Sequence, residues 1–200
     1  TSPLEDPYVG PVTDPYSGLV FYELSHEWGT GVPSYPGDAD VIFDHGVKHA
    51  QFGVQAFKVR TNFHTGTHMI APIHMKARTQ DLETLDPSRY FGNGVILDLR
   101  SKSNWDKITA DDLKSAGQIQ DGDIIAINTG WHHKYSDSME YFGEAPGLTL
   151  DAAQYLISKN PKFVAIDTPY IDCPCATNLT PHKGMPGPFM KRLVPIYEEK

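Results

Sequence analysis

The sequence has little cysteine, little positive charge and no long apolar run. Its two cysteines, Cys173 and Cys175, flank a single proline, a spacing that does not favour disulfide geometry. We therefore expect two free thiols in a loop, rather than metal ligands, in a reducing cytoplasm. No apolar stretch approaches the roughly 18 residues that cross a bilayer. No signal-peptide pattern is expected at the start of the chain either.

Charge restricts the partners further. The chain carries 25 acidic and 17 basic residues and has a net charge of −8. Nonspecific nucleic-acid binding needs a basic face, so no nucleic-acid partner is expected. Together these absences predict a cytoplasmic protein that binds neither nucleic acid nor a membrane.

Length and local patterns predict an α/β protein with one domain, a mixed β-sheet core and flanking helices. A chain of 200 residues with 40% hydrophobic content can bury a full core. Thr109 and Asp112 are spaced as a capping box, which predicts a helix over 110–116 that ends at Gly117. Thr149 is expected to cap a second helix that runs to 158. Strands are predicted at 19–24, 54–59, 95–99, 124–128 and 163–166, and long loops over 25–53.

The N-terminus is organised around proline. Prolines recur at every fourth position from Pro3 to Pro15, which forbids helix and predicts an extended arm over 1–18. A catalytic domain over 19–200 would follow. The arm is either a loose tail or a segment that packs on its own domain or a partner, because its tyrosines and valines offer apolar surface.

A dense group of histidines marks the expected functional site. His64, His68 and His74 fall within eleven residues, together with Gly66 and Pro72. Glycine permits a tight turn and proline stiffens the exit, so the rings can converge. Histidine is both the commonest metal ligand and the commonest general base near neutral pH. A turn, rather than a helix, is expected between His64 and His68.

This segment resembles the core motif of the cyclase family of metal-dependent hydrolases, His-x-Gly-Thr-His-x-Asp-x-Pro-x-His. The match departs at Ile70, where the family has aspartate. Other segments similar to family blocks are 24–26, 32–38, 129–131, 146–148 and 166–172. The matched motif positions are His64, Gly66, Thr67, His68, Pro72 and His74.

The resemblance implies a fold, a reaction and an assembly. The fold would be the swivelling β/β/α architecture of cyclases. The reaction would be hydrolysis of a small amide, formamide, lactam or lactone by metal-activated water. His64 and His68 would be metal ligands, and His74 the catalytic acid/base. His182 and Glu198 would belong to a second metal site. A homodimer or homotetramer is implied, with N-terminal segments covering a neighbour's active-site mouth.

Ile70 changes this scheme, because an isoleucine has no donor atom. The remaining candidates, His64, His68, His182 and then Glu198, suffice for one zinc-type site with three protein ligands. We therefore expect one divalent ion, zinc or manganese, or an empty site. The alternative function is a divergent relative, either a metal-free lyase or isomerase or a non-catalytic binding protein. We further expect an aspartate placed at position 70 to lie in an apolar setting and to destabilise the metal-free protein.

Aromatic residues and the remaining polar groups complete the candidates. Trp28, Tyr35 and Trp131 are predicted to bind a planar small-molecule substrate, with core packing as the alternative for each. His132 and His133 follow Trp131, and at least one of them is expected to be only a loop residue. Asp167 is expected to cap a turn or support a ligand rather than to act in catalysis.

Overall fold

The computed structural model describes residues 11–36 and 38–172. The chain divides into two compact units, Thr1–Met69 and Ile70–Lys200, and each is described by itself. The division falls inside the histidine motif, between its second and third histidines. Predictions that concern His182, Glu198, the two cysteines and the first ten residues of the arm lie outside the described residues.

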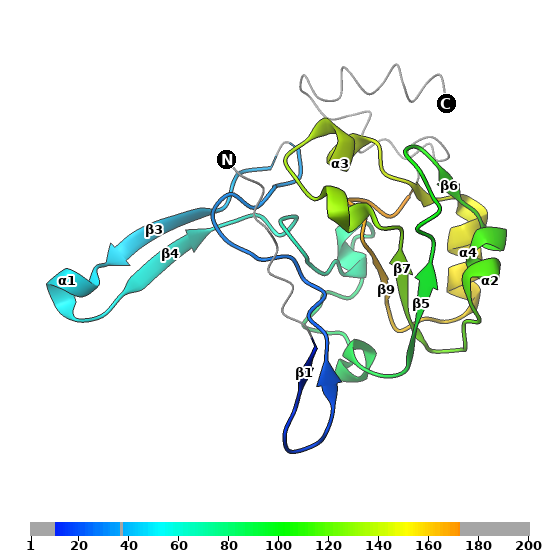
Figure 1. Ribbon diagram of the computed structural model, residues 1–200, viewed down its shortest axis with the longest axis horizontal. Helices are drawn as coiled ribbons and strands as arrows, with labels where there is room; N and C mark the ends of the chain where they lie inside the picture. The colour runs from blue at the N-terminus through cyan, green and yellow to red at the C-terminus, as the bar shows by residue number, and fades with distance from the viewer. Residues whose placement is uncertain (1–10, 37, 173–200) are drawn as a thin grey trace. The chain divides into compact units, whose positions relative to one another are not determined.

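The first unit is built from two antiparallel hairpins (Figure 1). In the first hairpin, the Asp14 carboxylate accepts hydrogen bonds from the backbone N–H groups of Tyr16 and Ser17 and so closes the turn. The last part of the predicted arm is therefore the first strand of this hairpin. The strands are β1 (Val12–Thr13) paired with β2 (Val20–Phe21), and β3 (Ile42–Val47) paired with β4 (Ala56–Arg60).

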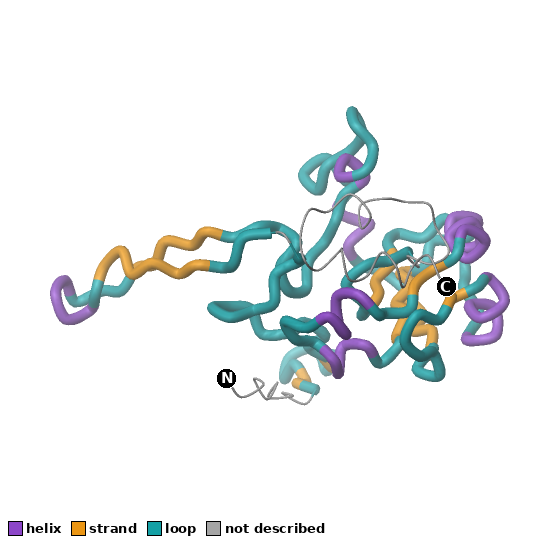
Figure 2. The backbone as a smooth tube through the Cα atoms, turned by 90° about the horizontal axis from the view of Figure 1, so that it is seen from above, coloured by secondary structure: helices purple, strands orange, loops and turns teal. Residues whose placement is uncertain are grey.

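The second hairpin corrects the sequence prediction for 25–53. Long loops were expected there, but β3 and the short helix α1 (His49–Phe52) occupy its second half, and α1 closes the tip of the hairpin (Figure 2). This strand was not predicted from the sequence, because the region is rich in glycine and polar residues and its apolar and polar residues do not alternate regularly. The register shifts between His45 and Val47, which marks a β-bulge.

The second unit contains the central sheet. Its three strands are parallel and lie in the order β5-β7-β9. Two-residue strands β6 (Lys107–Ile108) and β8 (Gly147–Leu148) pair beside it, also in parallel. The chain is thus α/β with both antiparallel and parallel sheets, which confirms the predicted class. The central strands are β5 (Gly94–Asp98), β7 (Ile124–Asn128) and β9 (Val164–Ile166), close to three of the predicted ranges.

Two helices pack on one face of this sheet, α2 (Ala110–Ala116) and α4 (Leu150–Ser158) (Figure 1). The predicted capping box is present on α2, where Thr109 and Asp112 bond each other's backbone N–H groups. On α4, Thr149 occupies the N-cap position but its hydroxyl does not bond the helix N–H groups. That hydroxyl instead donates to the Ile108 carbonyl or to Asp151. The remaining helices are α3 (Met139–Gly143), η1 (Pro72–His74), η2 (Pro87–Tyr90) and η3 (Trp131–Lys134).

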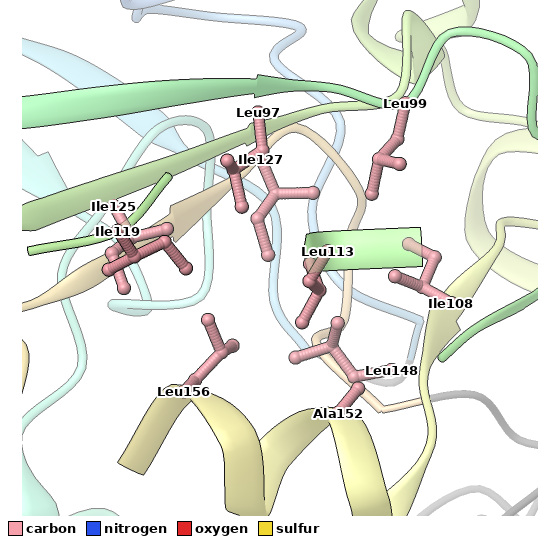
Figure 3. Packing of buried hydrophobic residues seen from close by; sticks show 10 residues of the cluster. All are labelled: Leu97, Leu99, Ile108, Leu113, Ile119, Ile125, Ile127, Leu148, Ala152 and Leu156. Carbon is pink, nitrogen blue, oxygen red and sulfur yellow. The ribbon is translucent and has the colours of Figure 1, made fainter. Parts of the chain in front are cut away.

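The hydrophobic core lies between the sheet and these two helices (Figure 3). Alternate residues of each strand point into it, while Ile96, on the other face of β5, is 66% exposed. Because of this alternation, every second side chain of a strand faces the helices and the others face away from them. The core residues are Leu97, Leu99, Ile108, Leu113, Ile119, Ile125, Ile127, Leu148, Ala152 and Leu156. Within the described ranges no helix has the length and apolar character to span a membrane.

Candidate active site

The histidine motif forms a turn in the first unit that brings two imidazoles together. Nδ1 of His64 lies 3.3 Å from Nε2 of His68. Gly66 between them has φ of 63°, in the left-handed region that favours glycine. Nδ1 of His68 lies 2.9 Å from the Gly66 carbonyl oxygen and donates to it. The turn expected in place of a helix is therefore confirmed.

The geometry of this pair fits two ligands of one metal ion. Because Nδ1 of His68 donates to Gly66, Nε2 of the neutral ring keeps its lone pair. Two nitrogens bound tetrahedrally to zinc at about 2.0–2.1 Å lie about 3.3 Å apart, the separation that the pair has. The same distance suits an N–H···N hydrogen bond when His64 carries its proton on Nδ1. The distance is therefore compatible both with a shared cation and with a hydrogen bond between the two rings.

A third ligand is required for a catalytic zinc site. In residues 11–36 and 38–172, no three or more histidine, cysteine, aspartate or glutamate side chains gather in a way that could hold an ion. The predicted further ligands, His182 and Glu198, lie outside the described residues. The described residues therefore bring together two candidate ligands, and the metal roles of these two histidines, of His182 and of Glu198 stay predictions.

Two N-terminal segments that resemble family blocks pack against this turn. Ser34 pairs with Thr65 in an isolated antiparallel bridge, and the Tyr35 N–H donates to the His64 carbonyl at 3.3 Å. The His26 N–H donates to Thr67 Oγ1 at 3.2 Å. The Ser34 and Thr65 hydroxyls are buried without a hydrogen-bond partner among the described residues. Buried hydroxyls normally have a partner, so this spot suits a polar ligand.

The third histidine of the motif belongs to the second unit. His74 ends η1, in which Pro72 is the first residue and the His74 N–H donates to the Ala71 carbonyl at 3.0 Å. The proline thus fixes the backbone leading to His74, as the sequence suggested. Ile70 is 55% exposed, so the expectation of an apolar setting at position 70 is wrong. A polar side chain there would be hydrated.

The three aromatic candidates lie in different environments. The Tyr35 ring is 6.5 Å from the His64 ring between centroids, which places it beside the histidine pair. Trp28 is exposed and contacts Phe43 edge-on at 5.5 Å. Trp131 is 2% exposed, and its Nε1 donates to the Tyr141 carbonyl at 3.0 Å. Packing accounts for Trp131, whereas substrate binding by Tyr35 and Trp28 stays a prediction.

A second polar group lies at the carboxyl ends of β7 and β9, and it joins two residues that the sequence analysis considered separately. Asp167 accepts hydrogen bonds from Thr129 and from His132, whose Nδ1 is 3.0 Å from Asp167 Oδ2. Burial alone would raise the pKa of Asp167, but the hydrogen bonds from His132 and Thr129 together lower it. A signal for this pair was present, because Asp167 directly follows the strand predicted over 163–166 and His132 lies shortly after the strand predicted over 124–128.

The protein combines an α/β core with a histidine pair in a glycine turn. Comparison with known proteins shows which family has this combination. The chain belongs to the Cyclase family, whose model matches residues 22–173. A curated relative is the kynurenine formamidase of Bacillus cereus (strain ATCC 14579), which is 26% identical over 151 residues, covering 75% of this chain and 69% of that protein.

Solved structures agree on the fold. One is a potential metal-dependent hydrolase with cyclase activity, with a TM-score of 0.63 and 25% identity over 86% of this chain and 75% of the other. Another is an isatin hydrolase bound to the product analogue thioisatinate, with a TM-score of 0.62 and 22% identity. That match covers 72% of this chain but only 64% of the isatin hydrolase, less than two thirds of its length. The relatives are hydrolases by name, at low identity.

Proposed function

We propose that this protein is a metal-dependent hydrolase of a small amide, formamide, lactam or lactone. The observation that carries the proposal is the 3.3 Å separation of His64 Nδ1 and His68 Nε2. The bond from His68 Nδ1 to Gly66 supports it, because it directs the lone pair of the other ring nitrogen toward the partner ring. The hydrolase names of the relatives support the reaction class.

The histidine pair would hold one divalent ion, zinc or manganese. His182 would be the third ligand and Glu198 a further candidate. When bound, such an ion polarises a carbonyl group and lowers the pKa of water. Ile70 offers no oxygen where the family pattern has a carboxylate, so we propose one ion per chain rather than two.

His74 would transfer protons during hydrolysis. As water attacks the acyl carbon, it loses a proton, and the leaving nitrogen or oxygen must gain one. His74 is the last residue of the 3₁₀ helix η1, which begins at Pro72, so its backbone is held in one conformation. A histidine in such a setting suits proton transfer, which needs a fixed approach to the substrate.

The alternative is a divergent relative without metal, either a lyase or isomerase that uses His74 as a base or a binding protein without turnover. Ile70 is the observation that favours it, because replacing a carboxylate by a hydrocarbon weakens any cation site. Metal content separates the two functions.

The experiment is metal analysis of the purified protein by plasma mass spectrometry, before and after incubation with zinc or manganese. We expect up to one equivalent in the parent and a large loss in His68→Ala. His49→Ala is the matched control, because His49 lies exposed in α1, and it should bind like the parent. Two equivalents per chain would contradict the single site. No uptake by the parent would favour the metal-free alternative.

Turnover is measured with formanilide and isatin as probes. We expect His74→Ala to abolish turnover while metal content and melting temperature stay close to those of the parent. A collapse of the melting temperature would instead give His74 a structural role.

A further inference from the structure

A cavity of about 450 Å³ opens in the second unit, between the last turns of α2 and α4 and the loop over 117–121. This volume is within the range of small-molecule sites. The chain runs from α2 into β7 and from α4 into β9, so the cavity lies toward the amino ends of these strands. Ligands of open α/β sheets normally bind outside the carboxyl ends. The sheet topology therefore does not account for this cavity.

Two lysine side chains meet at one aromatic ring that lines the cavity. Lys114 Nζ lies 5.6 Å from the ring centroid of Tyr155, and Lys159 Nζ lies 5.3 Å from it. Each position suits a cation–π contact. The two ammonium groups repel each other, however, and an anion between them would remove that repulsion. The chain as a whole has a net charge of −8, so this gathering of positive charge runs against its composition.

Neither ammonium group is firmly neutralised by the described part of the protein. Lys114 pairs with Asp111 at 2.8 Å, but the two side chains are 53% and 89% exposed, and exposed pairs of this kind contribute little to stability. The hydrogen bond to Asp111 raises the pKa of Lys114, so the group stays charged at neutral pH. Lys159 has no ion-pair partner among the described residues. Both charges are therefore available to a ligand.

The walls of the cavity are held by the core and by hydrogen bonds. Ile119, in the loop over 117–121, is 3% exposed and belongs to the hydrophobic core. The Gln120 N–H donates to Asp123 Oδ2 at 2.8 Å. The Gly122 N–H donates to the Lys159 carbonyl at 3.1 Å, which ties the loop to the end of α4. The cavity is thus formed before any ligand binds, which lowers the entropic cost of binding.

The remaining polar groups favour an anion. Gln118 and Gln120 contribute side-chain amides, each of which has two N–H donors. Asp121 also lines the cavity and is exposed, so one carboxylate opposes an anion where two ammonium groups attract it. Charged and amide donors together suit the oxygens of a carboxylate or phosphate group.

We propose that this cavity binds a small anion with two or more negative charges, a dicarboxylate or a phosphate, between Lys114 and Lys159. Such a ligand links the end of α2 to the end of α4 and removes the repulsion between the two ammonium groups. Because the native fold brings the two lysines together, the bound anion stabilises the folded protein. The site uses no residue of the histidine motif, and the inference does not rest on the proposed hydrolysis.

Isothermal titration calorimetry at constant ionic strength tests the site, with succinate and inorganic phosphate as separate probes. We expect at least one of them to bind the parent, and Lys159→Gln and Lys114→Gln each to lose about fivefold in affinity, because one ion pair is removed. Lys107→Gln, which changes an exposed lysine of β6, is the matched control and should bind like the parent. Asp121→Asn should bind more tightly, because a like charge is removed.

Succinamide has the size of succinate without its charges and should not bind. Binding of succinate alone would assign a dicarboxylate, and binding of phosphate alone a phosphate group. Hydrogen exchange locates the contact: the bound anion should slow exchange of the backbone N–H groups over 117–122 and leave the β3–β4 hairpin unchanged. Failure of both anions to bind, or binding that neither lysine substitution weakens, would overturn the proposal.

Discussion

Ile70 stands where the cyclase pattern has an aspartate, between His68 and His74 in the sequence. Its side chain removes two oxygen donors and a negative charge from the motif. Because the side chain is 55% exposed, Ile70 is not part of a buried apolar cluster. A carboxylate at position 70 would therefore not disturb the hydrophobic core.

Ile70→Asp should leave the melting temperature of the metal-free protein within a few degrees of the parent value, because a half-exposed carboxylate stays hydrated. Zinc or manganese should raise the melting temperature of the variant more than that of the parent, because ligands of the native state stabilise it. Thermal scans with and without each metal measure both effects. Ile73→Asp, which changes a similarly exposed isoleucine, is the control. A variant that ignores both metals would show that position 70 faces away from the site.

Asp167 predicts a pH dependence of stability. The pKa of Asp167 is lower in the folded protein than in the unfolded chain, where it is about 3.9. The ionised carboxylate therefore adds to the free energy of unfolding above that unfolded pKa. This stabilisation is lost as pH falls through the folded pKa. Asp167→Asn should reduce the free energy of unfolding by about 1–3 kcal/mol at pH 7. The difference in free energy of unfolding between parent and variant should be smaller at pH 3 than at pH 7. Urea titrations at the two pH values measure it, with the exposed Asp121→Asn as control. A difference independent of pH would contradict the assignment.

Secondary-structure elements depend on caps that differ between the two core helices. On α2, the Thr109 hydroxyl accepts from the Asp112 N–H and the Asp112 carboxylate accepts from the Thr109 N–H. On α4, Asp151 accepts from the Ala110 N–H at 2.9 Å, so the start of one helix also holds the start of the other. The two N-termini form one hydrogen-bonded unit beside the core.

Thr109→Ala should lower the free energy of unfolding by about 1 kcal/mol, the usual cost of removing an N-cap side chain. Urea denaturation measures the change. Ser115→Ala lies on the exposed side of the same helix and should change the free energy by less than about 0.5 kcal/mol. Equal effects of the two substitutions would mean that the cap is not stabilising.

At the scale of the whole molecule, the β3–β4 hairpin presents an apolar face. Phe43 pairs with Val59 and His45 pairs with Phe57, so these side chains share one side. Phe43 contacts both Phe57 and Trp28 through ring edges, at 6.3 and 5.5 Å between centroids. All of β4 is exposed. Apolar surface gathered in this way is typical of an interface.

We predict a homodimer or homotetramer in which this hairpin face, Trp28 and the N-terminal arm lie near a subunit interface. Sedimentation velocity gives the mass of the parent and of the double variant Phe57→Glu with Val59→Glu. We expect the double variant to shift toward the monomer, because two charges would be buried on association. Lys58→Glu, on the opposite side of β4, should keep the parent mass. A parent that is monomeric at tens of micromolar would contradict the prediction.

Local chemistry in the sequence determined much of this protein. The capping box at Thr109 and the strand over 124–128 rest on residues within one turn or one run, so the sequence predicts them directly. The glycine turn between His64 and His68 is likewise local. The strand predicted at 19–24 is shorter, because β2 covers only Val20–Phe21. The strand at 42–47 was missed, since its pairing with β4 decides it rather than its own pattern.

Only the tertiary structure decided which distant groups meet. Asp167 and His132 are 35 residues apart, and parallel pairing of β7 with β9 brings their positions to one edge of the sheet. The Thr149 hydroxyl turned to the distant Ile108 carbonyl, although its sequence position suits a helix cap. Exposure of Ile70 likewise depends on packing and not on its hydrophobicity. A local hydrogen bond depends on a few neighbouring residues, so a short segment of sequence predicts it. Burial and long-range pairing depend on the whole chain, so a short segment does not predict them.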